Sequence, residues 1–197
     1  MDKNAFASVA ARIDGYRDEV IKLQTEVCRR PAHDPTSGGT GEEEKAAWLE
    51  SYLSGLGFSI QHYDAPDPRV PSGRRPNLVM YYPKDAATGP RLWIIAHTDV
   101  VPTGDPALWS GDPWVVRVNG DKLIARGVED NQGGLTAAVM TARAFIEAGV
   151  EPKIPLALGF VADEETGSVY GLRHLIDKHR SLFREDDLIV IPDSGNS

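Results

Sequence analysis

The segment LWIIAHTD, residues 92–99, is an apolar run that ends in a histidine and an aspartate. Its first five residues are apolar on both faces, which is typical of a strand in a sheet that is covered on both sides. His97 and Asp99 lie on the same face if the chain stays extended beyond the strand. A carboxylate beside a histidine can hold the ring and raise its basicity, as at many metal sites. A core histidine paired with a local aspartate is the alternative.

Apolar runs of the same kind surround this segment, and helical patterns alternate with them, so the sequence predicts an α/β fold. We expect buried strands at 77–82, 92–96, 154–162 and 188–191, a short strand at 58–63, a hairpin at 115–125 around Asn119-Gly120, and an exposed loop at 64–76. We expect helices at 4–30, from a Thr40/Glu43 capping box to about Leu56, at 133–149 and at about 168–180.

Acidic residues follow three more of these elements. Asp163, Glu164 and Glu165 come directly after the strand expected at 154–162. Three consecutive carboxylates that leave a buried strand repel one another, and a bound cation explains them better than a solvated turn does. Asp130 precedes two glycines and a helix, where an acidic cap is the simpler explanation. Asp193 follows the strand expected at 188–191, and turn aspartates are common.

Taken together, these positions indicate one site. Sites in open parallel sheets form beyond the carboxyl ends of the strands, where His97, Glu165 and Asp193 are expected to converge, with Asp130 at the start of a neighbouring helix. Asp130, Glu165 and Asp193 supply three negative charges, and a hydroxide would be a fourth, which balances two divalent cations. Glu164 is then free to carry a proton.

Composition excludes several classes of protein. The chain of 197 residues contains 21 Lys and Arg against 29 Asp and Glu, a formal net charge of −8. An acidic chain of this kind is a poor candidate for nucleic acid or anionic membranes. The single cysteine, Cys28, permits no internal disulfide, and the N-terminal segment has no signal-peptide layout. We therefore expect a cytoplasmic protein that binds neither nucleic acid nor a membrane.

The motifs HTDVVPTGD (97–105), ARGVEDNQGG (125–134) and ADEETGS (162–168), in this order, resemble the M20 family of metallopeptidases and deacylases. This family includes succinyl-diaminopimelate desuccinylases, acetylornithine deacetylases, glutamate carboxypeptidases and carnosine-type dipeptidases. The segment WSGDPW (109–114) also looks like the family's stretch between the first two motifs. The resemblance implies a three-layer α/β/α, zinc-peptidase-like (phosphorylase/hydrolase-like) domain with a mostly parallel mixed sheet.

Each site residue takes a role from the resemblance. His97 and Asp193 would bind one metal, Glu165 would bind the other, and Asp130 would bridge the two. Asp99 would orient His97, and Glu164 would be the general acid/base in the hydrolysis of an amide bond. The resemblance also implies a cis peptide at Asp130-Asn131. The metals would be two zinc ions, with cobalt or manganese also suited to such ligands, and the substrate an N-acyl amino acid or short peptide.

The resemblance further implies that residues 1–197 are the N-terminal portion of a single catalytic domain. Family members continue into a lid or dimerisation domain and then a C-terminal catalytic segment, which supplies a last histidine ligand. His33, His62, His174 and His179 have no motif that matches it. We therefore expect this portion to be inactive alone, the fold to be incomplete at its C-terminal side, and the full-length protein to be a homodimer.

Other functions are compatible with parts of the pattern. A non-catalytic domain of this fold would bind a metal or a partner, but it has no need of Glu164 beside a ligand. A hydrolase that uses a carboxylate pair without metal has no need of His97. A serine or cysteine nucleophile is poorly supported, because Ser168 and Cys28 lack motif-like surroundings.

Overall fold

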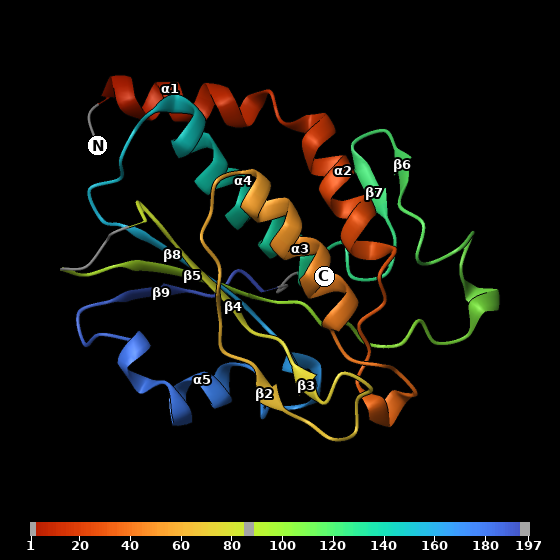
Figure 1. Cartoon of the computed structure of the whole chain (residues 1–197). Helices are drawn as coiled ribbons and strands as arrows, with labels where there is room; N and C mark the ends of the chain where they lie inside the picture. The colour runs from red at the N-terminus through yellow and green to blue at the C-terminus, as the bar shows by residue number, and fades with distance from the viewer. Residues whose placement is uncertain (1–2, 85–88, 194–197) are drawn as a thin grey trace.

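The computed structural model describes residues 3–84 and 89–193 and places a five-stranded mixed sheet at the centre of the molecule (Figure 1). The strands of this sheet are β1 (Gln61–His62), β4 (Leu78–Tyr82), β5 (Leu92–His97), β8 (Leu156–Val161) and β9 (Leu188–Val190). Their order is β1-β4-β8-β5-β9. Strand β5 runs parallel to both of its neighbours, whereas β4 is antiparallel to β1 and to β8.

Four helices cover one face of the sheet: α1 (Lys3–Asp14), α2 (Arg17–Cys28), α3 (Glu43–Gly55) and α4 (Gln132–Ala148). They bury a large apolar cluster in which Leu23, Leu49 and Leu135 meet strand residues such as Leu158. In strands, alternate residues point to opposite faces. Met80, Leu158 and Phe160 accordingly face these helices, and their neighbours face the other way.

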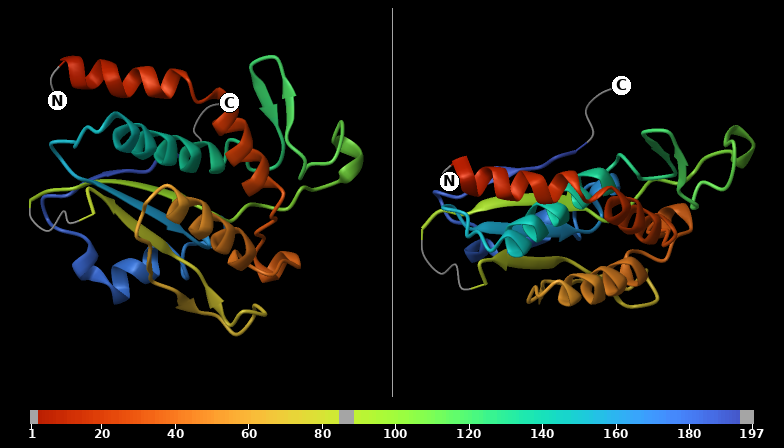
Figure 2. Two further views of the ribbon diagram at one scale, coloured as in Figure 1. Left: turned by 45° about the horizontal axis from the view of Figure 1, so that its top comes forward. Right: turned by 90° about the horizontal axis from the view of Figure 1, so that it is seen from above.

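Helix α5 (Leu172–Lys178) covers the opposite face, and the views in Figure 2 show the sheet between the two layers. Leu175 of α5 packs with Val79, Trp93 and Val161 in a second apolar cluster. The predicted three-layer α/β/α fold is therefore confirmed. Two small antiparallel ribbons complete it: β2 (Ala65–Pro66) with β3 (Arg74–Arg75), and β6 (Arg117–Asn119) with β7 (Lys122–Ile124). The second is the predicted hairpin.

The N-terminal part differs from the expectation of one helix over 4–30. The chain turns at Gly15-Tyr16, between α1 and α2. Tyr16 is buried there, and its hydroxyl donates to Glu147 Oε2 at 2.8 Å. The helical periodicity is the same on both sides of the turn, so it gave no sign of the break. The predicted capping box was also wrong, because α3 begins at Glu43 after Glu42, which makes no side-chain cap.

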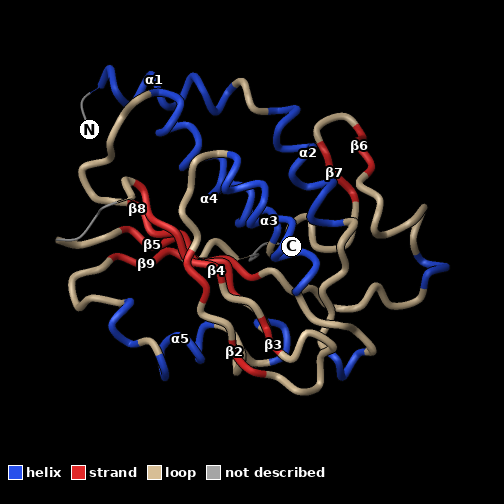
Figure 3. The backbone as a smooth tube through the Cα atoms, in the orientation of Figure 1, coloured by secondary structure: helices blue, strands red, loops and turns tan. Residues whose placement is uncertain are grey.

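Two burial predictions were wrong as well. The segment 64–76 forms a ribbon, and Asp67 and Arg75 within it are fully buried. Strand β9 was expected to be buried, but Leu188, Ile189 and Val190 are each about half exposed. Among the described strands β9 pairs only with β5, so it lies at an edge of the sheet, as the tube in Figure 3 shows. Over the described ranges, the structure has no helix with the length and apolar character needed to cross a bilayer.

Candidate metal centre

The carboxyl ends of three parallel strands meet at one edge of the sheet. His97 is the last residue of β5 and lies in register with Val161, the last residue of β8. The two strands are joined just beyond this point, where the Thr98 N–H donates to the Val161 carbonyl at 2.8 Å. Glu164 and Glu165 follow in a short 3₁₀ turn, η3 (Glu164–Thr166), and Asp193 follows β9.

Asp130 reaches the same edge from the loop before α4. Its side chain is about half exposed, and the peptide Asp130-Asn131 is cis, as the resemblance implied. Gly134, in the first turn of α4, lies so close to Asn131 Oδ1 and the Pro192 carbonyl that a Cβ would collide with both. The glycine therefore lets the start of α4 approach the segment that carries Asp193.

Two groups of side chains at this edge could each hold a cation. His97, Asp130 and Glu165 form one group, and His97, Glu164 and Asp193 form the other; within each group the ligand atoms lie within 4.8 Å of one another. His97 Nε2 is 3.0 Å from Asp130 Oδ1, 3.8 Å from Glu164 Oε2 and 3.9 Å from Asp193 Oδ1. Donor atoms around a tetrahedral zinc ion lie roughly 3.3–3.6 Å apart. The observed spacing fits such an ion after small adjustments of the side chains.

Asp99 holds the two strand ends together. The ring of His97 lies with Nδ1 3.0 Å from the Asp99 carbonyl oxygen and 3.4 Å from its carboxylate. The Asp99 carboxylate also accepts the backbone N–H groups of Glu164 and Glu165, each at 3.0 Å. The orientation of His97 was predicted, but the contact with the Glu164-Glu165 backbone was not. These contacts leave His97 Nε2 directed at the acidic side chains.

The site carries more negative charge than its one histidine can balance. Burial lowers the pKa of His97, but the hydrogen bond and charge of Asp99, with Glu164 and Glu165 nearby, outweigh it and raise that pKa to about 9. Burial and then the charge of Asp130 raise the pKa of Glu165 to about 7. Burial also raises the pKa of Glu164. Since carboxylates that crowd one another favour protons, the same oxygens are suited to a cation.

Asp163 is separated from its two acidic neighbours. It has a left-handed backbone conformation (φ 63°). Its carboxylate points away from the two groups of candidate ligands and accepts hydrogen bonds from the Thr166 hydroxyl and the Tyr170 N–H. The run of three acids thus divides, with Glu164 and Glu165 at the site and Asp163 in the buried structure beside it.

The other histidines, the cysteine and the serine considered in the sequence analysis lie outside both groups. His33 packs against Trp114, His62 is 2.9 Å from Glu50, and the rings of His174 and His179 contact each other edge to face. Cys28 is buried, and its Sγ donates to Gln132 Oε1. Ser168 lines a small cavity of about 90 Å³ beside His97, Glu164 and Asp193, but its backbone serves the turn after Asp163.

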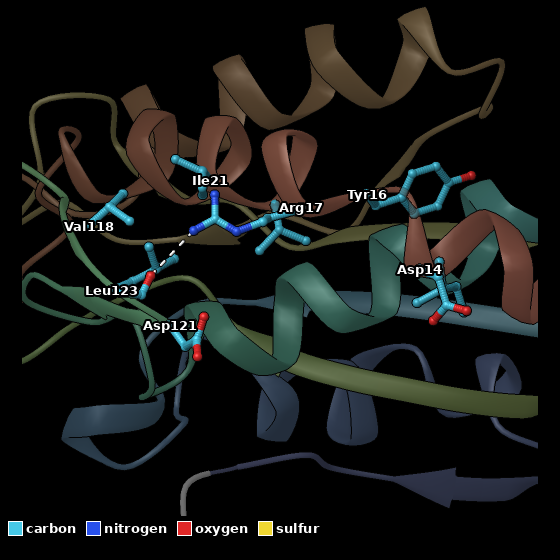
Figure 4. Close-up of a pocket in the computed structure, with 10 residues that line it drawn as sticks. Asp14, Tyr16, Arg17, Ile21, Val118, Asp121 and Leu123 are labelled. Atoms are coloured by element: carbon cyan, nitrogen blue, oxygen red, sulfur yellow. Dashed lines mark hydrogen bonds between the residues drawn. The ribbon is translucent and has the colours of Figure 1, made fainter.

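A larger pocket, of about 360 Å³, lies between the α1–α2 turn and the β6–β7 hairpin (Figure 4). Its lining is mostly apolar, with Arg17 donating to the Gly120 carbonyl at 3.3 Å. It holds neither of the two cation-binding groups found among the described residues.

The fold and the converging side chains define a three-layer α/β/α domain with a candidate metal centre at the carboxyl ends of its parallel strands. Comparison with known proteins then gives the family. The model of peptidase family M20/M25/M40 matches residues 93–196, and the chain belongs to this family.

Individual relatives agree with the assignment. The chain is 35% identical over 184 residues to an uncharacterized metallohydrolase of Methanocaldococcus jannaschii, covering 90% of this chain and 44% of the relative. It is 31% identical over 176 residues to a succinyl-diaminopimelate desuccinylase of Rhodospirillum centenum, covering 89% and 43%. The structure of the dipeptidase Dug1p of Saccharomyces cerevisiae matches with a TM-score of 0.79 at 26% identity, covering 95% and 41%. The chain thus spans less than half the length of the relatives it matches.

Proposed function

We propose that the protein is a metal-dependent hydrolase that cleaves an amide bond in an N-acyl amino acid or a short peptide. The observation that carries this proposal is the convergence of His97, Asp130, Glu164, Glu165 and Asp193 within two overlapping groups at one edge of the sheet. The named relatives support it, because a desuccinylase and a dipeptidase both act on small molecules with an amide bond.

The donor set suits a pair of divalent cations. His97 and Asp193 would bind one ion, Glu165 would bind the other, and Asp130 would serve both, since it is the exposed carboxylate nearest to His97 Nε2. A nitrogen donor among carboxylates is compatible with zinc, and also with cobalt or manganese. Asp99 would fix the His97 ring so that Nε2 is the ligand atom.

When bound, the metals would supply Lewis acidity, which polarises the amide carbonyl and makes a water molecule easier to deprotonate. Glu164 would move the proton. Its carboxylate is partly exposed and lies 3.8 Å from His97 Nε2, so a water on a cation held by His97 would be within its reach. Glu164 would take a proton from the attacking water and give it to the leaving amine nitrogen. Asp99 would hold Glu164 in place through its backbone N–H.

We extend the proposal to the whole protein on the basis of the family resemblance. Residues 1–197 would belong to a single catalytic domain, and the protein would be a cytoplasmic homodimer whose remaining parts supply a further histidine ligand and substrate contacts. Light scattering of the full-length protein tests the dimer, and fractionation of its source cells tests the location.

Metal content tests the function first. We expect the purified chain, dialysed against trace zinc, to hold one or two zinc ions by plasma mass spectrometry, and the His97→Ala and Asp130→Ala variants to lose them. His62→Ala is a matched control, because this histidine is exposed and lies outside both groups. A metal-free chain of residues 1–197 whose full-length form binds metal would show that the further histidine ligand is required. Full-length protein without metal, or equal loss in the control, would contradict the proposed site. Metal binding without hydrolysis by the full-length protein would instead indicate a non-catalytic metal-binding domain.

A further inference from the structure

The first turn of α3 contacts both of the loops that carry the candidate metal ligands. Glu42, which precedes α3, and Lys45, in its first turn, are three positions apart and therefore lie on one face of the helix. Both side chains are almost completely buried, at 0% and 1% exposure. Buried charges are costly unless they are paired, so such a pair calls for an explanation.

Lys45 reaches the loop after β5. Its ammonium group donates to the Thr98 carbonyl oxygen at 2.8 Å. This carbonyl belongs to the residue between His97 and Asp99, and Asp99 in turn holds the His97 ring. Lys45 therefore fixes the backbone from which the histidine ligand and its orienting aspartate project.

Glu42 reaches the loop after β8. Its Oε1 accepts the backbone N–H of Asp163 at 3.3 Å, directly before Glu164. The carboxylate is held in place by Arg75, whose Nε donates to Oε2 at 2.6 Å and whose Nη2 donates to Oε1. Arg75 is itself fully buried and also donates to Asp34 Oδ2 at 2.9 Å.

These contacts and those of Asp99 connect α3 and the two loops in a ring of hydrogen bonds. Glu42 and Lys45 join α3 to the two loops, and Asp99 joins the loops to each other through the N–H groups of Glu164 and Glu165. The first turn of α3 therefore contacts the backbone next to His97 and next to the two glutamates. The charged residues 42–45 resemble an ordinary solvated helix start, so this arrangement could not be predicted from them.

We propose that Glu42 and Lys45 are positioning residues, which set the separation of the two ligand-bearing loops through the first turn of α3. The inference rests on the proposed function, because it concerns the geometry of the proposed metal site. A purely structural role is the alternative. Replacing a whole buried ion pair with apolar groups is often neutral or stabilising, but removing one partner is destabilising. Both variants are therefore expected to lose stability, and the positioning role is decided by comparing their metal affinity and local exchange with those of a variant that loses stability alone.

Two variants and one control test the proposal. Lys45→Met keeps an unbranched side chain, shorter by one atom, but removes the donor to Thr98. Glu42→Gln places an amide NH₂ group against the guanidinium of Arg75. Leu53→Ala is the control, because Leu53 is buried in the same helix but belongs to the apolar cluster. Zn²⁺ affinity is measured by chelator competition, and the geometry of the site by the visible spectrum of the Co²⁺-loaded chain. Amide hydrogen exchange is measured in the metal-free protein and followed in the peptides that cover residues 97–99 and 163–165.

We expect each of the two variants to bind Zn²⁺ about 10-fold more weakly, as is typical when a group that supports metal ligands is removed. The Co²⁺ bands should change in shape, and exchange should become faster at 97–99 in Lys45→Met and at 163–165 in Glu42→Gln. Leu53→Ala should lower the unfolding midpoint but leave the affinity and the Co²⁺ spectrum unchanged.

Affinity, spectrum and exchange that match the wild type in both variants would overturn the inference, as would equal changes in Leu53→Ala. Wild-type protein that binds neither ion, even at full length, would overturn the proposed function instead. In that case the exchange data, which need no metal, still decide whether Glu42 and Lys45 position the loops.

Discussion

Asp99 holds three polar groups of the candidate metal centre at once: the ring of His97 and the N–H groups of Glu164 and Glu165. Asp99→Asn keeps the size of the side chain but presents one NH₂ group to these donors. We expect Zn²⁺ affinity to fall by about 10- to 100-fold, measured by competition with a chelator of known affinity. A change of less than twofold would show that Asp99 does not support the ligands.

Glu164 has a different predicted role from Glu165, although the two are adjacent. In full-length protein that hydrolyses its substrate, Glu164→Ala should lower kcat by at least about 10²-fold, because the proton carrier is lost. The metal content should stay the same. Glu165→Ala is the comparison, and it should lose metal. Loss of metal from Glu164→Ala would assign Glu164 to the ligands, in line with its place beside His97 and Asp193.

Some residues at this edge of the sheet could be singled out from the sequence, and others could not. His97, Asp130, Glu165 and Asp193 could be singled out because each follows an apolar strand or precedes a helix, and strand ends meet at a predictable edge. Arg75 could not be singled out. Its partners Asp34 and Glu42 are distant along the chain, and its Pro-rich surroundings are typical of an exposed loop.

At the scale of elements, Asp187 joins the start of β5 to the segment before β9. Its carboxylate accepts the Arg91 N–H and the Trp93 Nε1–H, each at 2.8 Å. Burial opposes ionisation, but hydrogen bonds from Arg91, the Arg184 backbone and Trp93 outweigh it and lower the pKa of Asp187 to about 2. The folded state therefore favours the charged form.

This linkage predicts how stability depends on pH. A carboxylate with a pKa of about 3.9 in the unfolded chain stabilises the fold fully above that pH, and the contribution is lost as pH falls toward the folded pKa. Asp187→Asn should cost about 1–3 kcal/mol at pH 7. The difference from wild type, measured by urea unfolding, should shrink between about pH 4 and pH 2. A difference that is constant over this range would contradict the role of the charge.

A strand or hairpin could be predicted where the residue pattern of the segment itself determines its structure. The runs that became β4, β5 and β8 are apolar on both faces, and the Asn119-Gly120 turn fixed the β6–β7 hairpin. The exposure of β9 was not predictable, since its residues are as apolar as those of β5. Burial depends on which strand lies alongside, and among the described strands β9 has only β5 as a neighbour.

At the scale of the whole molecule, the candidate metal centre joins parts of the chain that are far apart in the sequence. Its side chains come from the ends of β5 and β9, from the turn after β8 and from the loop before α4. A cation bound there would cross-link four segments of the native fold, whereas the unfolded chain offers no such arrangement. Binding to the folded state alone stabilises it by mass action.

Zn²⁺ binding at the candidate metal centre should raise the stability of the folded chain by a defined amount. At a free Zn²⁺ concentration of 100 times Kd, the folded chain should gain about 2.7 kcal/mol. For a chain of this length, about 1 kcal/mol shifts Tm by roughly 2–4 °C, so we expect an increase of about 5–10 °C in a thermal melt. A chelator should reverse the increase, and His97→Ala should abolish it while His62→Ala preserves it. An equal rise of Tm in His97→Ala would place the stabilising ion elsewhere on the molecule. If zinc does not change Tm, the folded chain binds zinc no better than the unfolded chain does.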